Sequence, residues 1–185
     1  MFLSFGPAML LQALFLSASL MAVEPVPLTA VAQVDLGRYL GVWHEIARFP
    51  NYFQKGCDQA QAKYSLLADG SIEVLNTCLK PDGKLKSVLG MATVVDKNSN
   101  AKLKVTFLPA WLRWTGIGSG DYWVVDLASD YRYAVVSEPG RNYLWILSRT
   151  PVMEQKDYQA VLDRMAILGL DATRLIASQP RNLTR

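Results

Sequence analysis

Few residues in this chain have the side-chain chemistry that catalysis or metal binding requires. The only histidine, His44, stands beside Glu45 in the stretch GVWHEIARFP, and the two cysteines are Cys57 and Cys78. A histidine can act as a general base, and an unpaired cysteine can act as a nucleophile. One histidine and two isolated cysteines supply too few ligands for a structural zinc site. We therefore predict no metal and no cofactor.

Length, composition and charge describe one domain without a nucleic-acid partner. The chain has 185 residues, of which 51% are hydrophobic, so it is long enough to bury one sizeable core. Lysine and arginine number 19 against 16 aspartates and glutamates, which gives a formal net charge of +3. Because the basic residues are spread singly along the chain, no nucleic-acid partner is expected.

The first residues have the composition of a secretory signal peptide. An apolar run extends from Ala8 to Val23 and is interrupted only by Gln12 and small serines. We predict a signal peptide over residues 1–22, with the cleavage site open and a retained membrane anchor as the alternative.

The predicted export of the protein decides whether the two cysteines are expected to be bonded or free. An even cysteine count in an oxidising compartment favours a disulfide, so we predict a bond between Cys57 and Cys78. The two residues lie at unequal distances from the Asp69-Gly70 turn. They are therefore not a simple cross-strand pair, and the chain must turn back after Gly56 to bring them together.

The elements that must position these residues are strands. Eight stretches rich in valine, isoleucine, tyrosine, tryptophan and threonine alternate with turn residues such as Pro81-Asp82-Gly83. The pattern predicts an all-β fold, an eight-stranded antiparallel up-and-down β-barrel. Apolar residues at helical spacing predict one C-terminal α-helix within residues 154–171, packed outside the barrel. The predicted strands lie within residues 38–47, 57–67, 71–80, 85–96, 101–109, 121–127, 131–138 and 142–149.

Alternation along the strands predicts which side chains line the barrel interior. If Trp43 points inward, Glu45 and Ala47 share its side and His44 points outward. We expect an arginine or a tyrosine hydroxyl to pair with Glu45, and a catalytic acid is the alternative. The predicted wall consists of Glu45, Ala47, Ala60, Ala62, Val74, Asn76, Ala92, Val94, Val105, Phe107, Tyr122, Val124, Val136, Tyr143 and Trp145. Its small alanines leave volume unfilled, and its few polar groups could orient an amphiphile.

Three motifs resemble the signature of the lipocalin family. They are Gly41-x-Trp43 in the first strand, Asp130-Tyr131 in the turn after the sixth, and Arg149 at the end of the eighth. The longer strings GVWHEIARFPNYFQKGC and YLWILSRTP are similar to the bacterial outer-membrane type, which is related to apolipoprotein D. The resemblance implies one lipocalin domain over residues 33–180.

The resemblance also implies roles for the signature residues. Gly41, Trp43, Asp130, Tyr131 and Arg149 would be structural, with the Arg149 guanidinium stacked on the Trp43 indole at the closed end of the barrel. Lipoproteins of the bacterial type carry a cysteine directly after the signal region, and here the first cysteine lies far inside the fold. We therefore expect a periplasmic or secreted protein, with peripheral outer-membrane association left open.

The implied function is lipid binding without catalysis. Eight-stranded barrels, for which lipocalins are a standard example, are either filled by side chains or hold one small ligand. The resemblance implies a fatty acid or lysophospholipid, stored or transported in maintenance of the bacterial envelope. We predict a binding protein that is no enzyme, whose partner is a single-chain lipid; a homodimer stays open. Two alternatives remain, a lipocalin-fold enzyme acting on a small apolar substrate and a small outer-membrane barrel, which the scattered lysines disfavour.

Two aromatic segments are predicted to border the open end of the barrel. The first, RFPNYFQKG, contains Phe49, Tyr52 and Phe53, and the second, LPAWLRWTGIG, contains Trp111 and Trp114. Such loops either pack over the mouth or contact a membrane or a partner.

Overall fold

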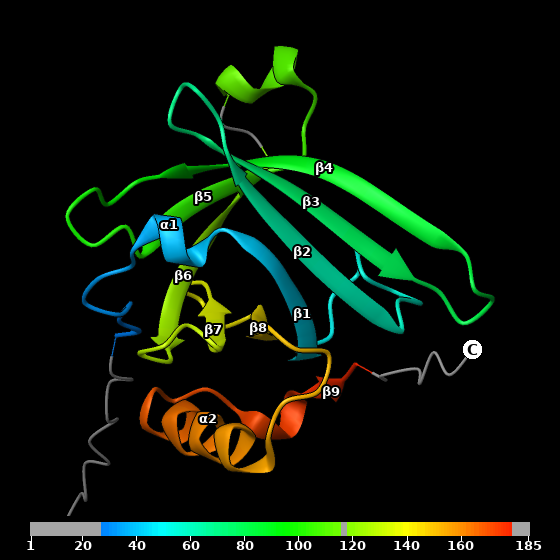
Figure 1. Ribbon diagram of the computed structural model, residues 1–185, viewed down its shortest axis with the longest axis vertical. Coiled ribbons are helices and arrows are strands. Elements are labelled where there is room, and N and C mark those ends of the chain that lie inside the picture. Colours follow the sequence, from blue (N-terminus) through cyan, green and yellow to red (C-terminus); the bar gives the residue numbers. More distant parts are fainter. Residues whose placement is uncertain (1–26, 116–117, 179–185) are drawn as a thin grey trace, which may run out of the picture.

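The computed structural model describes residues 27–115 and 118–178 (Figure 1). The predicted signal peptide lies outside these residues. The strands are β1 Gly41–Arg48, β2 Gln59–Leu66, β3 Ile72–Leu79, β4 Leu85–Val94, β5 Lys102–Thr106, β6 Ser119–Leu127, β7 Tyr133–Ser137, β8 Leu144–Ser148 and β9 Ile176–Ala177. The helices are α1 Leu36–Tyr39 and α2 Gln155–Ile167, with 3₁₀ turns at Ala110–Thr115 and Ala172–Arg174. Over the part of the chain that is described, no helix has the length and hydropathy to cross a membrane.

Strands β1 to β8 form a closed antiparallel barrel, which confirms the predicted fold class. Each strand pairs with the next along the chain, and β1 closes the barrel by pairing with both β8 and β2. The short β9 adds to the edge of β1 beyond the point where β2 leaves it. The first strand starts later than predicted because residues 36–39 form α1. Asp35 caps the N-terminus of this helix, and its carboxylate accepts a hydrogen bond from the Arg38 backbone N–H.

A β-bulge in β1 reverses the alternation near its end. Glu45 pairs with Leu147 of β8, but Ala47 pairs with Ile146, so one extra residue of β1 lies between the two pairs. Ala47 consequently packs outside the barrel beneath α2. The prediction that Ala47 lines the interior is corrected, because strict alternation does not continue through a bulge. Arg48 faces the interior in its place, opposite Trp145.

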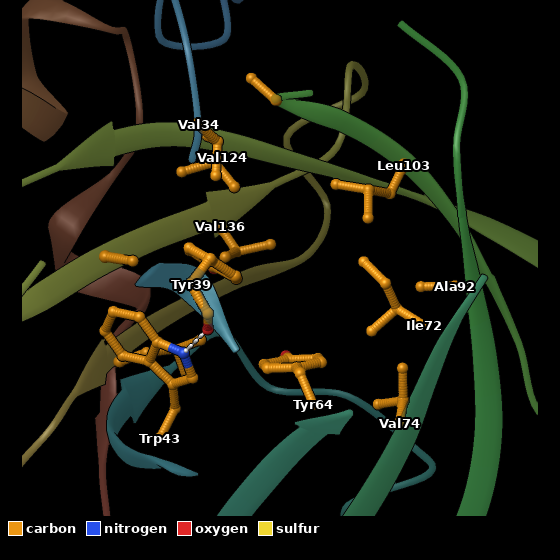
Figure 2. Packing of buried hydrophobic residues seen from close by; sticks show 13 residues of the cluster. Val34, Tyr39, Trp43, Tyr64, Ile72, Val74, Ala92, Leu103, Val124 and Val136 are labelled. Atoms are coloured by element: carbon orange, nitrogen blue, oxygen red, sulfur yellow. Dashed lines mark hydrogen bonds between the residues drawn. The ribbon is translucent and has the colours of Figure 1, made fainter. Parts of the chain in front are cut away.

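The buried apolar residues form two clusters on opposite faces of the barrel wall. The inner cluster surrounds Trp43 and runs from Tyr39 and Tyr64 to Ile72 and Val74 (Figure 2). The outer cluster joins α2 to β6, β7 and β8, as the placement of α2 against these strands in Figure 1 shows. Its buried helix residues are spaced as an amphipathic helix requires. The predicted packing of a C-terminal helix outside the barrel is confirmed.

The disulfide between Cys57 and Cys78 is present, with the two Cα atoms 5.6 Å apart. Within the β2–β3 pair, Cys78 lies opposite Ala60, so the bonded residues are not cross-strand neighbours. Gly56 has a φ of +74°, a conformation that favours glycine, and directs Cys57 back toward β3. The bond therefore fastens the loop after β1 to the third strand.

We expect the double substitution Cys57→Ala and Cys78→Ala to lower the free energy of unfolding by about 3 kcal/mol, because the bond closes a loop with a sequence separation of 21. Urea denaturation followed by far-UV circular dichroism measures this change. Reduction of the unmodified protein should produce a similar loss. A double variant as stable as the oxidised protein would show that the loop is held by its other contacts.

Candidate functional site

One end of the barrel is closed by Trp43 and Arg149. The indole is fully buried, and the guanidinium carbon lies 3.7 Å from the centre of the indole ring. Trp43 Nε1 donates a 2.8 Å hydrogen bond to the carbonyl oxygen of Tyr39. The Arg149 guanidinium donates to the carbonyl oxygens of Arg38, Leu40, Val42 and Tyr131. Trp43 and Arg149 are held together by stacking and by hydrogen bonds to backbone carbonyl oxygens. We call this pair the floor of the barrel.

The remaining signature residues surround this floor. Gly41 has a φ of +94°, and a Cβ placed there would lie 3.5 Å from Arg149 Nη1, so glycine suits this position on backbone grounds. The Tyr131 hydroxyl accepts a 2.8 Å hydrogen bond from the backbone N–H of Asp35. Asp130 accepts a hydrogen bond from the Arg132 side chain at 2.8 Å, in the same turn. All three motifs therefore contribute to one end of the barrel.

Toward the opposite end, several interior positions carry a small side chain or none, as at Ala62, Gly90 and Gly120. We call this region the upper calyx and define it by Ala62, Val74, Asn76, Gly90, Phe107, Gly120 and Trp145. Gly120 pairs with the inward-facing Val105, is exposed, and has no atom within 4 Å of where a Cβ would lie. The Phe107 ring covers Gly90 so closely that a Cβ there would lie 2.6 Å from it. The inner face of β6 is therefore open at Gly120.

The lower half of the barrel has little free space. A void of about 10 Å³ remains between Tyr64, Tyr122 and Ile72, which is close to the room that one water molecule needs. Large side chains, including Tyr39 and Leu103, occupy the rest of this region (Figure 2). The expectation that interior alanines leave volume unfilled therefore does not hold for Ala92 in the lower half, and for Ala60 and Ala62 it stays a prediction.

Aromatic rings border the mouth on the side of β8. Phe53 lies 5.7 Å from Tyr143 and 6.2 Å from Trp145, measured between ring centres. The Gln54 side chain accepts a 2.8 Å hydrogen bond from Trp145 Nε1. Phe53 and Tyr52 remain exposed, so part of the predicted aromatic loop does border the mouth. Phe49 does not, because it is buried in the outer cluster.

On the other side of the mouth, the second aromatic segment contributes Trp111. Its side chain is 72% exposed, so it does not pack over the barrel. The side chain of Trp114 lies outside the described part of the structure.

Glu45 is buried and fully engaged. Its carboxylate accepts 2.6 Å hydrogen bonds from Arg48 Nη1, from the Gln54 amide and from the Ser178 hydroxyl. The expected arginine partner is present, and these contacts connect β1 to the following loop and to the C-terminal segment. His44 lies half-buried on the outer face, where partial burial lowers its pKa and favours the neutral imidazole.

Three tyrosine hydroxyls meet where the upper calyx narrows. Tyr122 Oη lies 2.8 Å from Tyr39 Oη and 3.0 Å from Tyr64 Oη. We call these residues the tyrosine triad. Burial raises the pKa of Tyr64 to about 12 and raises the pKa values of Tyr39 and Tyr122 above their ordinary range. At neutral pH all three phenols are therefore protonated and uncharged.

Comparison with known proteins agrees with this architecture. The family model of the lipocalin-like domain matches residues 34–180. The chain belongs to the lipocalin family. Temperature-induced lipocalin-1 from Arabidopsis thaliana is 39% identical over 155 residues, and outer membrane lipoprotein Blc from Escherichia coli K12 is 39% identical over 153 residues. Each alignment covers 82% of this lipocalin and 82% of the relative.

More distant relatives extend the same similarity. Apolipoprotein D from Mus musculus is 34% identical over 156 residues, which is 80% of this lipocalin and 78% of the mouse protein. The structure of insecticyanin from the tobacco hornworm Manduca sexta superimposes with a TM-score of 0.66 over 86% of this lipocalin and 87% of insecticyanin. At 21% identity, this second likeness shows the fold alone. Family membership supports the binding of a small hydrophobic ligand.

Most of the predicted wall does face the interior of this lipocalin. The residues that pack with or in the inner cluster are Ala62, Val74, Ala92, Val94, Val105, Tyr122, Val124, Val136 and Trp145. Asn76 lies opposite Ala62 on the same face, Ala60 lies beside Cys78 near the mouth, and Tyr143 lies at the rim. Whether these residues contact a ligand remains a prediction.

The predicted wall leaves out several interior residues, among them Gly120, Tyr64, Tyr39 and Arg48. Gly120 could have been found, because it lies two residues before Tyr122 and so shares its face. Tyr64 shares the face of Ala62 by the same rule. Tyr39 was assigned to a strand, although it ends α1, and the bulge concealed Arg48.

Proposed function

We propose that this lipocalin binds single-chain lipids, either fatty acids or lysophospholipids, and stores or transports them in the bacterial cell envelope in support of membrane maintenance. The observation that carries the proposal is the upper calyx, an open and mostly apolar space above a closed floor. The Asn76 amide adds a polar group, as is usual in sites that orient an amphiphile.

Burial of an acyl chain supplies enough free energy for useful affinity. About ten methylene groups at roughly 0.8 kcal/mol each contribute about 8 kcal/mol before the costs of ordering the chain. This amount corresponds to a dissociation constant near the micromolar range. No covalent step is needed to explain retention of the ligand.

The reactive side chains of the chain support a carrier over an enzyme. Both cysteine sulfurs are joined in the disulfide, so neither is available as a thiolate nucleophile. His44 lies on the outer face of the barrel, and the Glu45 carboxylate is paired with Arg48. A general base facing a ligand in the upper calyx would have to come from another group.

Location and domain extent belong to the same proposal. We place the protein in the periplasm or outside the cell, as one lipocalin domain over residues 33–180. Bacterial relatives that are outer membrane lipoproteins support an envelope location. Peripheral association with the outer membrane and a homodimer are compatible with this placement.

Lipid titration tests the proposal. We expect fatty acids and lysophospholipids to change the intrinsic tryptophan emission in a saturable way, because Trp145 borders the upper calyx. The control is a soluble alcohol with too short a chain to fill the site. No saturable change up to roughly 100 micromolar, which corresponds to about 5 kcal/mol, would end the carrier proposal. Mass spectrometry of the extracted lipid checks for chemistry, and an altered lipid would favour the enzyme alternative.

A further inference from the structure

The tyrosine triad has one more hydrogen-bond donor than it can use internally. Three phenol groups supply three O–H donors, whereas the triad contains two hydroxyl-to-hydroxyl contacts. Each contact uses one proton, so one O–H remains without an acceptor inside the triad. A buried donor without an acceptor costs about 1 to 3 kcal/mol, so an acceptor that reaches it is favoured.

The tyrosine triad lies on the floor side of Gly120. Tyr122 is two residues below Gly120 on the same face of β6, and Gly120 opens onto free space. The small void below the upper calyx is lined by all three tyrosines and otherwise by apolar side chains such as Ala92 and Val105. The end of an inserted chain would therefore meet the triad before any other polar side chain of the floor.

The surroundings of the triad favour an uncharged acceptor. Arg149 is the cation of the adjacent floor, and its guanidinium is already committed to backbone carbonyls and to the Trp43 ring. A carboxylate beside the triad would be desolvated without a direct ion pair to this guanidinium, which is costly. A neutral carbonyl oxygen accepts a hydrogen bond without this cost.

We propose that the tyrosine triad is a binding subsite for the carbonyl oxygen of an uncharged lipid, such as a ketone, aldehyde or ester near the end of an apolar chain. The lipid enters carbonyl end first and leaves its tail toward the mouth. A fatty acid would bind in the opposite direction, with its carboxylate at the mouth. This inference rests on the proposed function, because it requires a ligand in the calyx.

The test compares three ligands of equal chain length, 2-undecanone, 1-undecene and undecanoate. Affinities are measured by displacement of an apolar fluorescent probe, and the ketone carries ¹³C at its carbonyl for infrared spectroscopy. The variant Tyr39→Phe/Tyr64→Phe/Tyr122→Phe removes all three hydroxyls together, because any smaller set leaves one donor unused. The control variant Tyr158→Phe removes a hydroxyl on α2, outside the barrel.

In the unmodified protein we expect the carbonyl stretch of bound ketone to lie at lower wavenumber than in an alkane solvent, as a hydrogen-bonded carbonyl does. The triple variant should lose this shift and weaken ketone binding by about tenfold, the effect of an unpaired buried carbonyl. Binding of 1-undecene and undecanoate should stay within about twofold, and Tyr158→Phe should change the binding of none of the three ligands.

The infrared spectrum of the unmodified protein decides the inference even if the triple variant fails to fold. A bound ketone whose carbonyl stretch matches the alkane value would overturn the subsite while leaving the carrier proposal intact. A shift that persists in the triple variant would overturn it as well, because another donor such as Asn76 would then hold the carbonyl. Failure of all three ligands to bind would remove the proposed function and the subsite together.

Discussion

Replacement of Arg149 by alanine is expected to lower the free energy of unfolding by about 3 to 4 kcal/mol, because it removes a stacked cation and leaves several carbonyls without a donor. The lost contacts connect the segment around α1, the start of β1 and the turn after β6, so no single neighbour can replace them. Lipid affinity per folded molecule should stay nearly unchanged, since the upper calyx lies at the other end of the barrel.

Chemical denaturation measures the stability change, and lipid titration of the folded variant measures affinity. Lys104→Ala is a suitable control, because it breaks an exposed ion pair with Asp121 and should cost well under 1 kcal/mol. An Arg149→Ala variant that is as stable as the unmodified protein but no longer binds lipid would reverse the assignment. The floor would then belong to the binding site.

The fold could be predicted because its signals are local and repeated. Turn residues such as Asp69-Gly70 and Asp82-Gly83 separate strands that pair with their neighbours, and Gly70 and Gly83 do adopt positive φ. The amphipathic spacing in α2 placed Val161 and Met165 against the barrel, where both are buried. No long-range information was needed for either result.

The interior could be predicted only where the alternation was unbroken. In β2 to β6 the rule held from Ala62 through Val124. In β1 it failed after Glu45, because the bulge depends on how β1 fits β8 and on β9 joining its edge, neither of which the local sequence reveals.

The small free volume in the lower half of the barrel also could not be predicted from the sequence. The alternation of side chains along a strand predicts which face each one lies on. It does not predict how far an aromatic ring reaches across the barrel. Tyr39 comes from α1, outside the strands, and its hydroxyl reaches Tyr122 on β6. Alanines at the same level therefore make room for these rings and leave little for a ligand.

The second large effect is expected at Ala62. Replacement of Ala62 by tryptophan should weaken lipid binding by more than about tenfold, because the indole would occupy volume that an acyl chain needs. Ala62 is partly buried on the inward face of β2, between Trp43 on one neighbouring strand and Asn76 on the other. Since Ala62 is only partly buried, we expect the new ring to cost less in stability than in binding.

Equilibrium dialysis with a radiolabelled fatty acid measures the affinity of this variant without interference from the added tryptophan. Lys63→Trp is the matched control, because it introduces the same ring one residue later, where the side chain is exposed on the outer face of the same strand. The control should bind lipid like the unmodified protein, since the calyx volume is unchanged. Equal binding by the Ala62→Trp variant would place the acyl chain outside the upper calyx, against the mouth loops instead of between the strands.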